Sequence, residues 1–105
     1  MKRYEVRLAA RAIQRLEEIE DRLFSEHYSD VAAEWFGRLL DGIEGLATGP
    51  ERFPVAEEGE FFSPPLRKLL VLPHRVLYQV IEERNVVYVV TIRHVRQRWL
   101  EGTEP

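Results

Sequence analysis

The amino-acid sequence predicts an α+β protein in which a helical hairpin packs on one face of a mainly antiparallel four-stranded sheet. The expected order of elements is β-αα-β-β-β. Three observations predict it: the first residues alternate as a strand does, two amphipathic helical stripes follow, and three strand-like runs come after residue 65. Because no part of this pattern could bury its apolar surface alone, we expect residues 1–105 to form a single domain.

The N-terminal half supplies one strand and both helices. Tyr4, Val6 and Leu8 alternate with charged residues, which indicates a short strand. Residues 12–26 and 31–47 place apolar side chains three or four positions apart, which is typical of amphipathic helices. Ser29 or Asp30 is the expected N-cap of the second helix, and the short link makes the helices antiparallel. The apolar residues expected to pack are Ala12, Ile13, Leu16, Ile19 and Leu23 in the first helix and Ala32, Trp35, Phe36, Leu39, Ile43 and Leu46 in the second.

The C-terminal half is expected to hold the remaining strands. Residues 48–65 are rich in Gly and Pro and form a loop, whose acidic stretch at 57–60 should be solvated. Residues 66–72, 75–82 and 86–92 then read as strands, with a tight turn at 83–85.

Composition excludes several classes of protein. A hydrophobic fraction of 45% and a charged fraction of 31% are those of an ordinary globular domain. The absence of cysteine excludes disulfides and thiolate chemistry. No apolar run approaches the roughly 20 residues that span a bilayer, and charged residues follow Met1 directly. We therefore expect a cytoplasmic protein with no membrane association and no signal peptide.

The net charge of −3 conceals an asymmetry. Residues 1–60 hold 14 acidic and 8 basic residues, whereas residues 61–105 hold 4 acidic and 7 basic residues. Such an imbalance suits one face to an anionic or acidic partner, although ordinary solvated surface would look the same. A protein devoted to bare RNA phosphates would be more basic overall.

The candidate site residues are basic. No phosphate-binding Gly-rich loop is present, and His27, His74 and His94 are far apart in the sequence, so we expect neither a metal nor a cofactor. The candidates are Arg67, Lys68, Arg75, Arg93, His94, Arg96 and Arg98. Adjacent strands could bring them together to stabilise a phosphate, with His94 as acid or base, or to bind acidic side chains of a partner. They could equally cap strand ends. Trp99 either folds back onto the core or anchors a partner.

A family resemblance rests on several motifs in order. Residues 66–69 (LRKL), 73–80 (PHRVLYQV), 86–92 and 94–96 (HVR) resemble the sheet half of the ParE/RelE toxin superfamily. Residues 49–54 (GPERFP) resemble the loop that follows the helical hairpin there. The resemblance covers roughly residues 3–98.

The resemblance implies a toxin of a type II toxin–antitoxin system, and the superfamily divides by function. RelE-like members are ribosome-dependent mRNA endoribonucleases that use basic residues together with a His, Tyr or Glu. ParE-like members generally lack that set and poison DNA gyrase by binding it. Both kinds are neutralised in a hetero-oligomeric complex by an antitoxin, a short DNA-binding protein whose C-terminal segment wraps around the toxin.

The ParE-like reading is favoured over the RelE-like one. His94-x-Arg96 resembles the ParE-type C-terminus, and Trp99 and Leu100 stand where RelE-like members carry a Tyr. Arg75, however, matches a functional position of RelE. The resemblance thus implies partner-binding roles for Arg67, Arg75, His94, Arg96, Arg98 and Trp99. If the chain is RelE-like, it implies a metal-independent catalytic set of Arg67, Lys68, Arg75, His94 and Arg96. A scaffold that binds an antitoxin without toxicity remains a further alternative.

Overall fold

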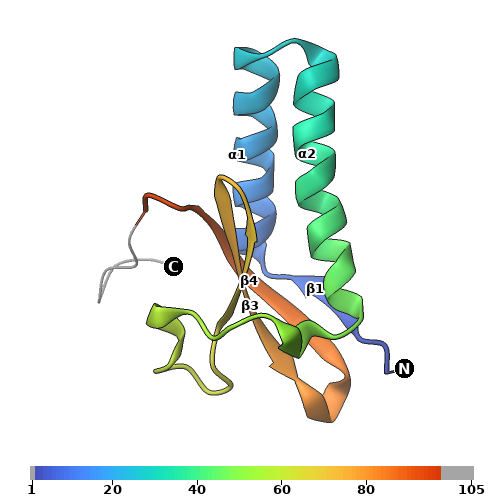
Figure 1. The fold of residues 1–105 in the computed structure, drawn as a ribbon, viewed down its shortest axis with the longest axis vertical. Coiled ribbons are helices and arrows are strands. Elements are labelled where there is room, and N and C mark those ends of the chain that lie inside the picture. The colour runs from blue at the N-terminus through green and yellow to red at the C-terminus, as the bar shows by residue number, and fades with distance from the viewer. Residues whose placement is uncertain (1, 98–105) are drawn as a thin grey trace.

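The computed structural model describes residues 2–97, and it confirms the expected element order (Figure 1). Three short 3₁₀ helices occupy the link between helices and sheet, and a fourth forms the last turn. No helix in the described range is long and apolar enough to cross a bilayer. The principal elements are β1 (Glu5–Leu8), α1 (Ala10–Glu26), α2 (Ser29–Glu44), β2 (Arg67–Val71), β3 (His74–Ile81) and β4 (Val86–His94).

The sheet has the strand order β1-β4-β3-β2. Two hairpins make the β2–β3 and β3–β4 pairings antiparallel, whereas β1 pairs with β4 in parallel, so the sheet is mixed. The helical hairpin explains the direction of β1. It returns the chain to the start of β1, where the Tyr4 N–H donates to the Ala47 carbonyl oxygen. β2 therefore runs in the same direction as β1. The two hairpins reverse the chain twice, so β4 also runs in this direction and pairs with β1 in parallel.

The helices cover one face of this sheet and form the core with it (Figure 1). Leu16, Leu39 and Ile43 from the helices pack against Val76, Tyr78 and other residues of the central strands. α2 begins at Ser29, and its N-cap is Tyr28 with no side-chain hydrogen bond, so the expected cap at Ser29 or Asp30 is wrong.

The loop between α2 and β2 covers the opposite face of the sheet. The Ala56 N–H donates to the Leu66 carbonyl oxygen, and the Gln79 side-chain amide donates to the Pro64 carbonyl oxygen. Gly59 approaches the chain so closely that a Cβ would lie 2.3 Å from the Leu66 oxygen. Packing of this kind buries Leu66 and Leu77 on that face.

Candidate functional site

The predicted basic residues do not form one cluster. Arg67 begins β2 and donates to two main-chain oxygens of the loop, at 2.6 Å to Phe53 and 3.2 Å to Glu51. Arg75 lies on the next strand and makes a two-pronged ion pair with Glu58, with nitrogen–oxygen distances of 2.9 and 2.6 Å. Both guanidinium groups therefore hold the loop against the sheet. Lys68, between them in the sequence, is half-buried on β2.

The Arg75–Glu58 pair is largely withdrawn from solvent, with side-chain exposures of 14% and 9%. Burial alone would raise the pKa of the Glu58 carboxyl. The hydrogen bonds from Arg75 and from the main chain, with the charges of Arg75 and Lys68, outweigh burial and hold this pKa below its ordinary value. Glu58 is thus an ionised, structural partner of Arg75, and the expectation that residues 57–60 are merely solvated is wrong for this residue.

His94 and Arg96 lie at the far end of β4, away from Arg67. The main-chain N–H of Arg96 donates to Nδ1 of His94 at 3.1 Å. A neutral His94 therefore carries its proton on Nε2, which faces outward as a donor. Arg93 is buried, whereas Arg96 is exposed. Arg98 and Trp99, the two remaining candidates, lie outside the described residues.

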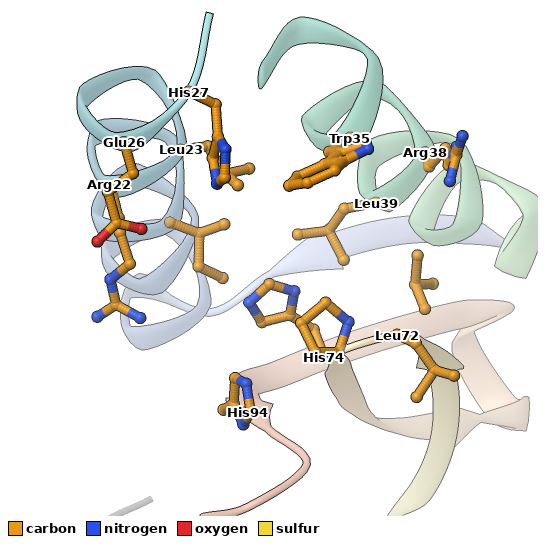
Figure 2. Close-up of a pocket in the computed structure, with 13 residues that line it drawn as sticks. Arg22, Leu23, Glu26, His27, Trp35, Arg38, Leu39, Leu72, His74 and His94 are labelled. Carbon is orange, nitrogen blue, oxygen red and sulfur yellow. The ribbon is translucent and has the colours of Figure 1, made fainter. Parts of the chain in front are cut away.

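A cavity of about 780 Å³ lies beside His94, and no pattern in the sequence indicated it. Figure 2 shows it between the C-terminal half of α1, the middle of α2, the turn that joins β2 to β3, and the end of β4. The lining residues are Ile19, Arg22, Leu23, Glu26, His27, Trp35, Arg38, Leu39, Val71, Leu72, Pro73, His74 and His94. We call it the histidine cavity, because all three histidines of the chain border it although the sequence spaces them widely.

Two pairs of rings border the histidine cavity. His27 and Trp35 meet edge to face, with ring centroids 4.7 Å apart, and the centroids of His74 and His94 lie 6.0 Å apart. Trp35 is 43% exposed, so the expectation that it is a core residue is wrong; Phe36 does pack against the core. Figure 1 shows that the joined ends of α1 and α2 extend past the sheet, so the apolar stripe that carries Trp35 continues beyond the strands. No spacing in the sequence indicates where the sheet stops covering the helices.

The rim of the histidine cavity is basic. Burial, with the nearby charges of His94 and Arg22, lowers the pKa of His74. Arg22 and Arg38 face the same space, and Glu26 is the one carboxylate among the lining residues (Figure 2). An adjoining hollow of about 270 Å³ shares Arg22, His74 and His94 and adds Arg96. Within residues 2–97, no three side chains are arranged to hold a metal ion. The arrangement suits an apolar ligand that carries negative charge.

Comparisons with known proteins agree on one superfamily. Residues 6–99 match the family model of the ParE toxin of type II toxin–antitoxin systems. No curated protein sequence matches the chain.

Solved toxin structures share the fold at low sequence identity. The chromosomal ParDE system of P. aeruginosa superposes with a TM-score of 0.71 at 14% identity, covering 90% of this chain and 98% of that one. The RelBE2 toxin–antitoxin complex of Mycobacterium tuberculosis gives 0.62 at 20% identity, with 90% and 93% covered. The archaeal RelE–RelB complex of Pyrococcus horikoshii gives 0.59 at 17% identity, with 93% and 100% covered.

Proposed function

Since the chain belongs to the ParE toxin family of type II toxin–antitoxin systems, we propose that it acts in the cytoplasm by binding and poisoning DNA gyrase. A cognate antitoxin neutralises it in a hetero-oligomeric complex. The family match supports the gyrase target over the ribosome, as does the net charge of −3, which suits a protein target better than bare RNA.

The engagement of Arg67 and Arg75 within the fold is the observation that carries this proposal. A nuclease needs several cations free to meet a reacting phosphate and a positioned acid or base. Here one arginine is bound to main-chain oxygens and the other to the Glu58 carboxylate. The neutral form of His94 uses Nδ1 to accept from Arg96 and so presents no lone pair outward as a base. A binding surface needs none of these groups free.

The proposed gyrase-contacting surface is the segment from His94 to Leu100. It begins with His94 and the exposed Arg96 and continues into Arg98 and Trp99. Aromatic and arginine side chains contribute most of the affinity in many interfaces, so Trp99 is the proposed anchor. Arg67 and Arg75 support partner binding indirectly, through the loop that they hold.

A RelE-like mRNA endoribonuclease is the second candidate. The strand register favours it, because Arg75 lies opposite Arg93 and His74 lies opposite His94. These two pairs are neighbours at one end of the β3–β4 pair, with the arginines on one face of the sheet and the histidines on the other. Arg75 could act on RNA there if it left Glu58.

Two assays on the same purified protein separate the candidates. We expect inhibition of gyrase supercoiling, relief of that inhibition by the antitoxin, and intact mRNA on translating ribosomes. Removal of residues 94–105 from a chain that still folds should abolish the inhibition. Codon-phased mRNA cleavage that Arg75→Ala abolishes would establish the second candidate instead. Inactivity in both assays would leave a scaffold that binds an antitoxin and is not toxic.

A further inference from the structure

The smaller hollow, of about 270 Å³, lies between α1 and the end of β4. Five of its lining side chains are basic and one is acidic, so we call it the basic hollow. Figure 2 shows Arg22, His74 and His94, which it shares with the histidine cavity. The lining residues are Arg15, Glu18, Ile19, Arg22, His74, Ile92, His94, Arg96 and Gln97.

The protein does not neutralise most of the positive charge in the basic hollow. Glu18, the one carboxylate that lines it, is already paired with Arg15 at 3.0 Å. Within residues 2–97, no ion pair involves Arg22 or Arg96. Two guanidinium groups from different elements therefore border one small space without a carboxylate of their own, which is a setting that attracts anions.

The turn after β4 holds Arg96 at this place. The main-chain N–H of His94 donates to the Gln97 side-chain oxygen at 2.8 Å, and the Gln97 N–H donates back to the His94 carbonyl oxygen at 2.9 Å. The Val95 N–H donates to the Pro73 carbonyl oxygen at 2.8 Å, which ties the turn to the start of β3. The wall of the hollow is thus fixed by main-chain contacts and needs no ligand to form.

The two histidines add a donor and a charge that depends on pH. The Arg96 N–H donates to Nδ1 of His94 at 3.1 Å, so the neutral ring presents its Nε2 proton as a donor. The ring centroids of His74 and His94 lie 6.0 Å apart. Burial, with the charges of His94 and Arg22, lowers the pKa of His74. An anion in the hollow would oppose this effect, because it stabilises the protonated rings.

We propose that the basic hollow binds the phosphate group of a small molecule, whose oxygens accept from Arg22, Arg96 and the Nε2 proton of His94. A phosphate offers several acceptor oxygens and up to two negative charges, whereas a carboxylate offers two oxygens and one charge. The volume lies just below the roughly 300–1,000 Å³ of drug-sized sites, so the ligand is small. The net charge of −3 disfavours a nucleic acid. The site does not depend on the proposed function.

The test titrates the full-length protein with inorganic phosphate at about pH 6 and follows the histidine ring signals by NMR. We expect saturable binding with a dissociation constant of about 1 mM or tighter, and binding of acetate at least about tenfold weaker. Glycerol phosphate distinguishes the two sources of the group. Tighter binding than inorganic phosphate would identify an organic phosphate as the ligand, and equal binding would identify the free ion.

Two arginine variants place the binding in the basic hollow. Arg22→Gln and Arg96→Gln should each weaken phosphate binding by about tenfold, because each removes a charged donor. Arg84→Gln is the matched control, since Arg84 lies in the turn between β3 and β4, and it should stay within about twofold of wild type.

The pH dependence of sulfate binding tests the histidines. Sulfate keeps its charge between about pH 5 and 8, so a change in its affinity reports on the protein. We expect the affinity to rise about tenfold from pH 8 to 5.5, because protonated histidines attract the anion. His74→Asn should reduce this rise, unlike His27→Asn, since His27 borders only the histidine cavity. The other charged groups that face the rings from the surrounding elements are Arg15, Glu18, Arg22, Glu26, Arg38 and Arg96.

Three outcomes would overturn the proposal and leave the proposed function untouched. The first is a folded wild type that binds neither phosphate nor sulfate saturably. The second is unchanged binding by folded Arg22→Gln and Arg96→Gln variants, which would indicate an adventitious ion only. The third is a short oligonucleotide that binds more tightly than phosphate and depends on the same two arginines, because the ligand would then not be small.

Discussion

Tyr78 shows how a polar side chain in the centre of the sheet stabilises this fold. It lies fully buried on β3, and its hydroxyl donates to the main-chain carbonyl oxygen of Pro50. Burial raises the pKa of this hydroxyl from 10.0 to about 12. The neutral hydroxyl is therefore the form that ties the start of the loop to the sheet.

Tyr78→Phe should lower the free energy of unfolding at pH 7 by about 1–3 kcal/mol, because the buried Pro50 oxygen loses its donor. The group also predicts a pH dependence. Tyrosine in the unfolded chain ionises near its ordinary value of 10.0, and Tyr78 in the folded chain near 12. Its contribution is thus complete below pH 10 and is lost as the pH rises toward 12. Urea unfolding at several pH values should show a smaller alkaline loss for Tyr78→Phe than for wild type or Tyr28→Phe. Parallel losses would contradict the assignment.

The strand positions of Arg67, Arg75 and His94 could be predicted from the sequence, whereas their partners could not. Glu58 is 17 positions from Arg75, and Pro50 is 28 positions from Tyr78. These separations cross an irregular loop whose path depends on packing rather than on any period in the sequence. A basic cluster inferred from neighbouring strands therefore turned out to be several separate contacts.

The sequence predicts the helices best, both where they lie and which of their residues face the core. Apolar spacing indicated residues 12–26 and 31–47, and the structure has Ala10–Glu26 and Ser29–Glu44. The stripe places Leu39 in the core at 2% exposure and its neighbour Leu40 on the surface side at 37%. Amphipathic periodicity works here because both helices bury one face on the same sheet.

Leu39→Ala should lower the free energy of unfolding by about 2–5 kcal/mol, since it leaves a cavity under the helix. Leu40→Ala is the matched control on the adjacent position and should cost well under half as much. Denaturant unfolding of the two variants measures both values. A cost below about 0.5 kcal/mol for Leu39→Ala would mean that this side chain is not in the core.

The sequence pattern predicted neither the parallel pairing of β1 with β4 nor the extension of the helices past the sheet. Local patterns indicate where a strand begins and ends, but the pairing of β1 with β4 depends on where the helical hairpin returns the chain. The histidine cavity arises for a related reason. It forms where four separate elements end, so no single stretch of sequence carries its signature.

The whole molecule divides its polar groups between two tasks. Arg67, Arg75 and Glu58 hold the long loop against the sheet and stabilise the fold. Arg22, His74, His94 and Arg96 border two adjoining hollows on the side of the sheet that the helices cover. The proposed action through a binding surface is compatible with this division, whereas RNA cleavage would need the first group free for chemistry.

A charge-swapped pair, Arg75→Glu with Glu58→Arg, tests this division most directly. The measurement is the activity of the folded double variant, in the supercoiling and mRNA-cleavage assays, beside wild type and the Arg75→Glu single variant. The double variant restores the ion pair but removes the cation from position 75. We expect the single variant to be destabilised and the double variant to inhibit supercoiling within about threefold of wild type, without mRNA cleavage. A double variant that folds like wild type but has lost the wild-type activity would show that Arg75 itself acts on the target.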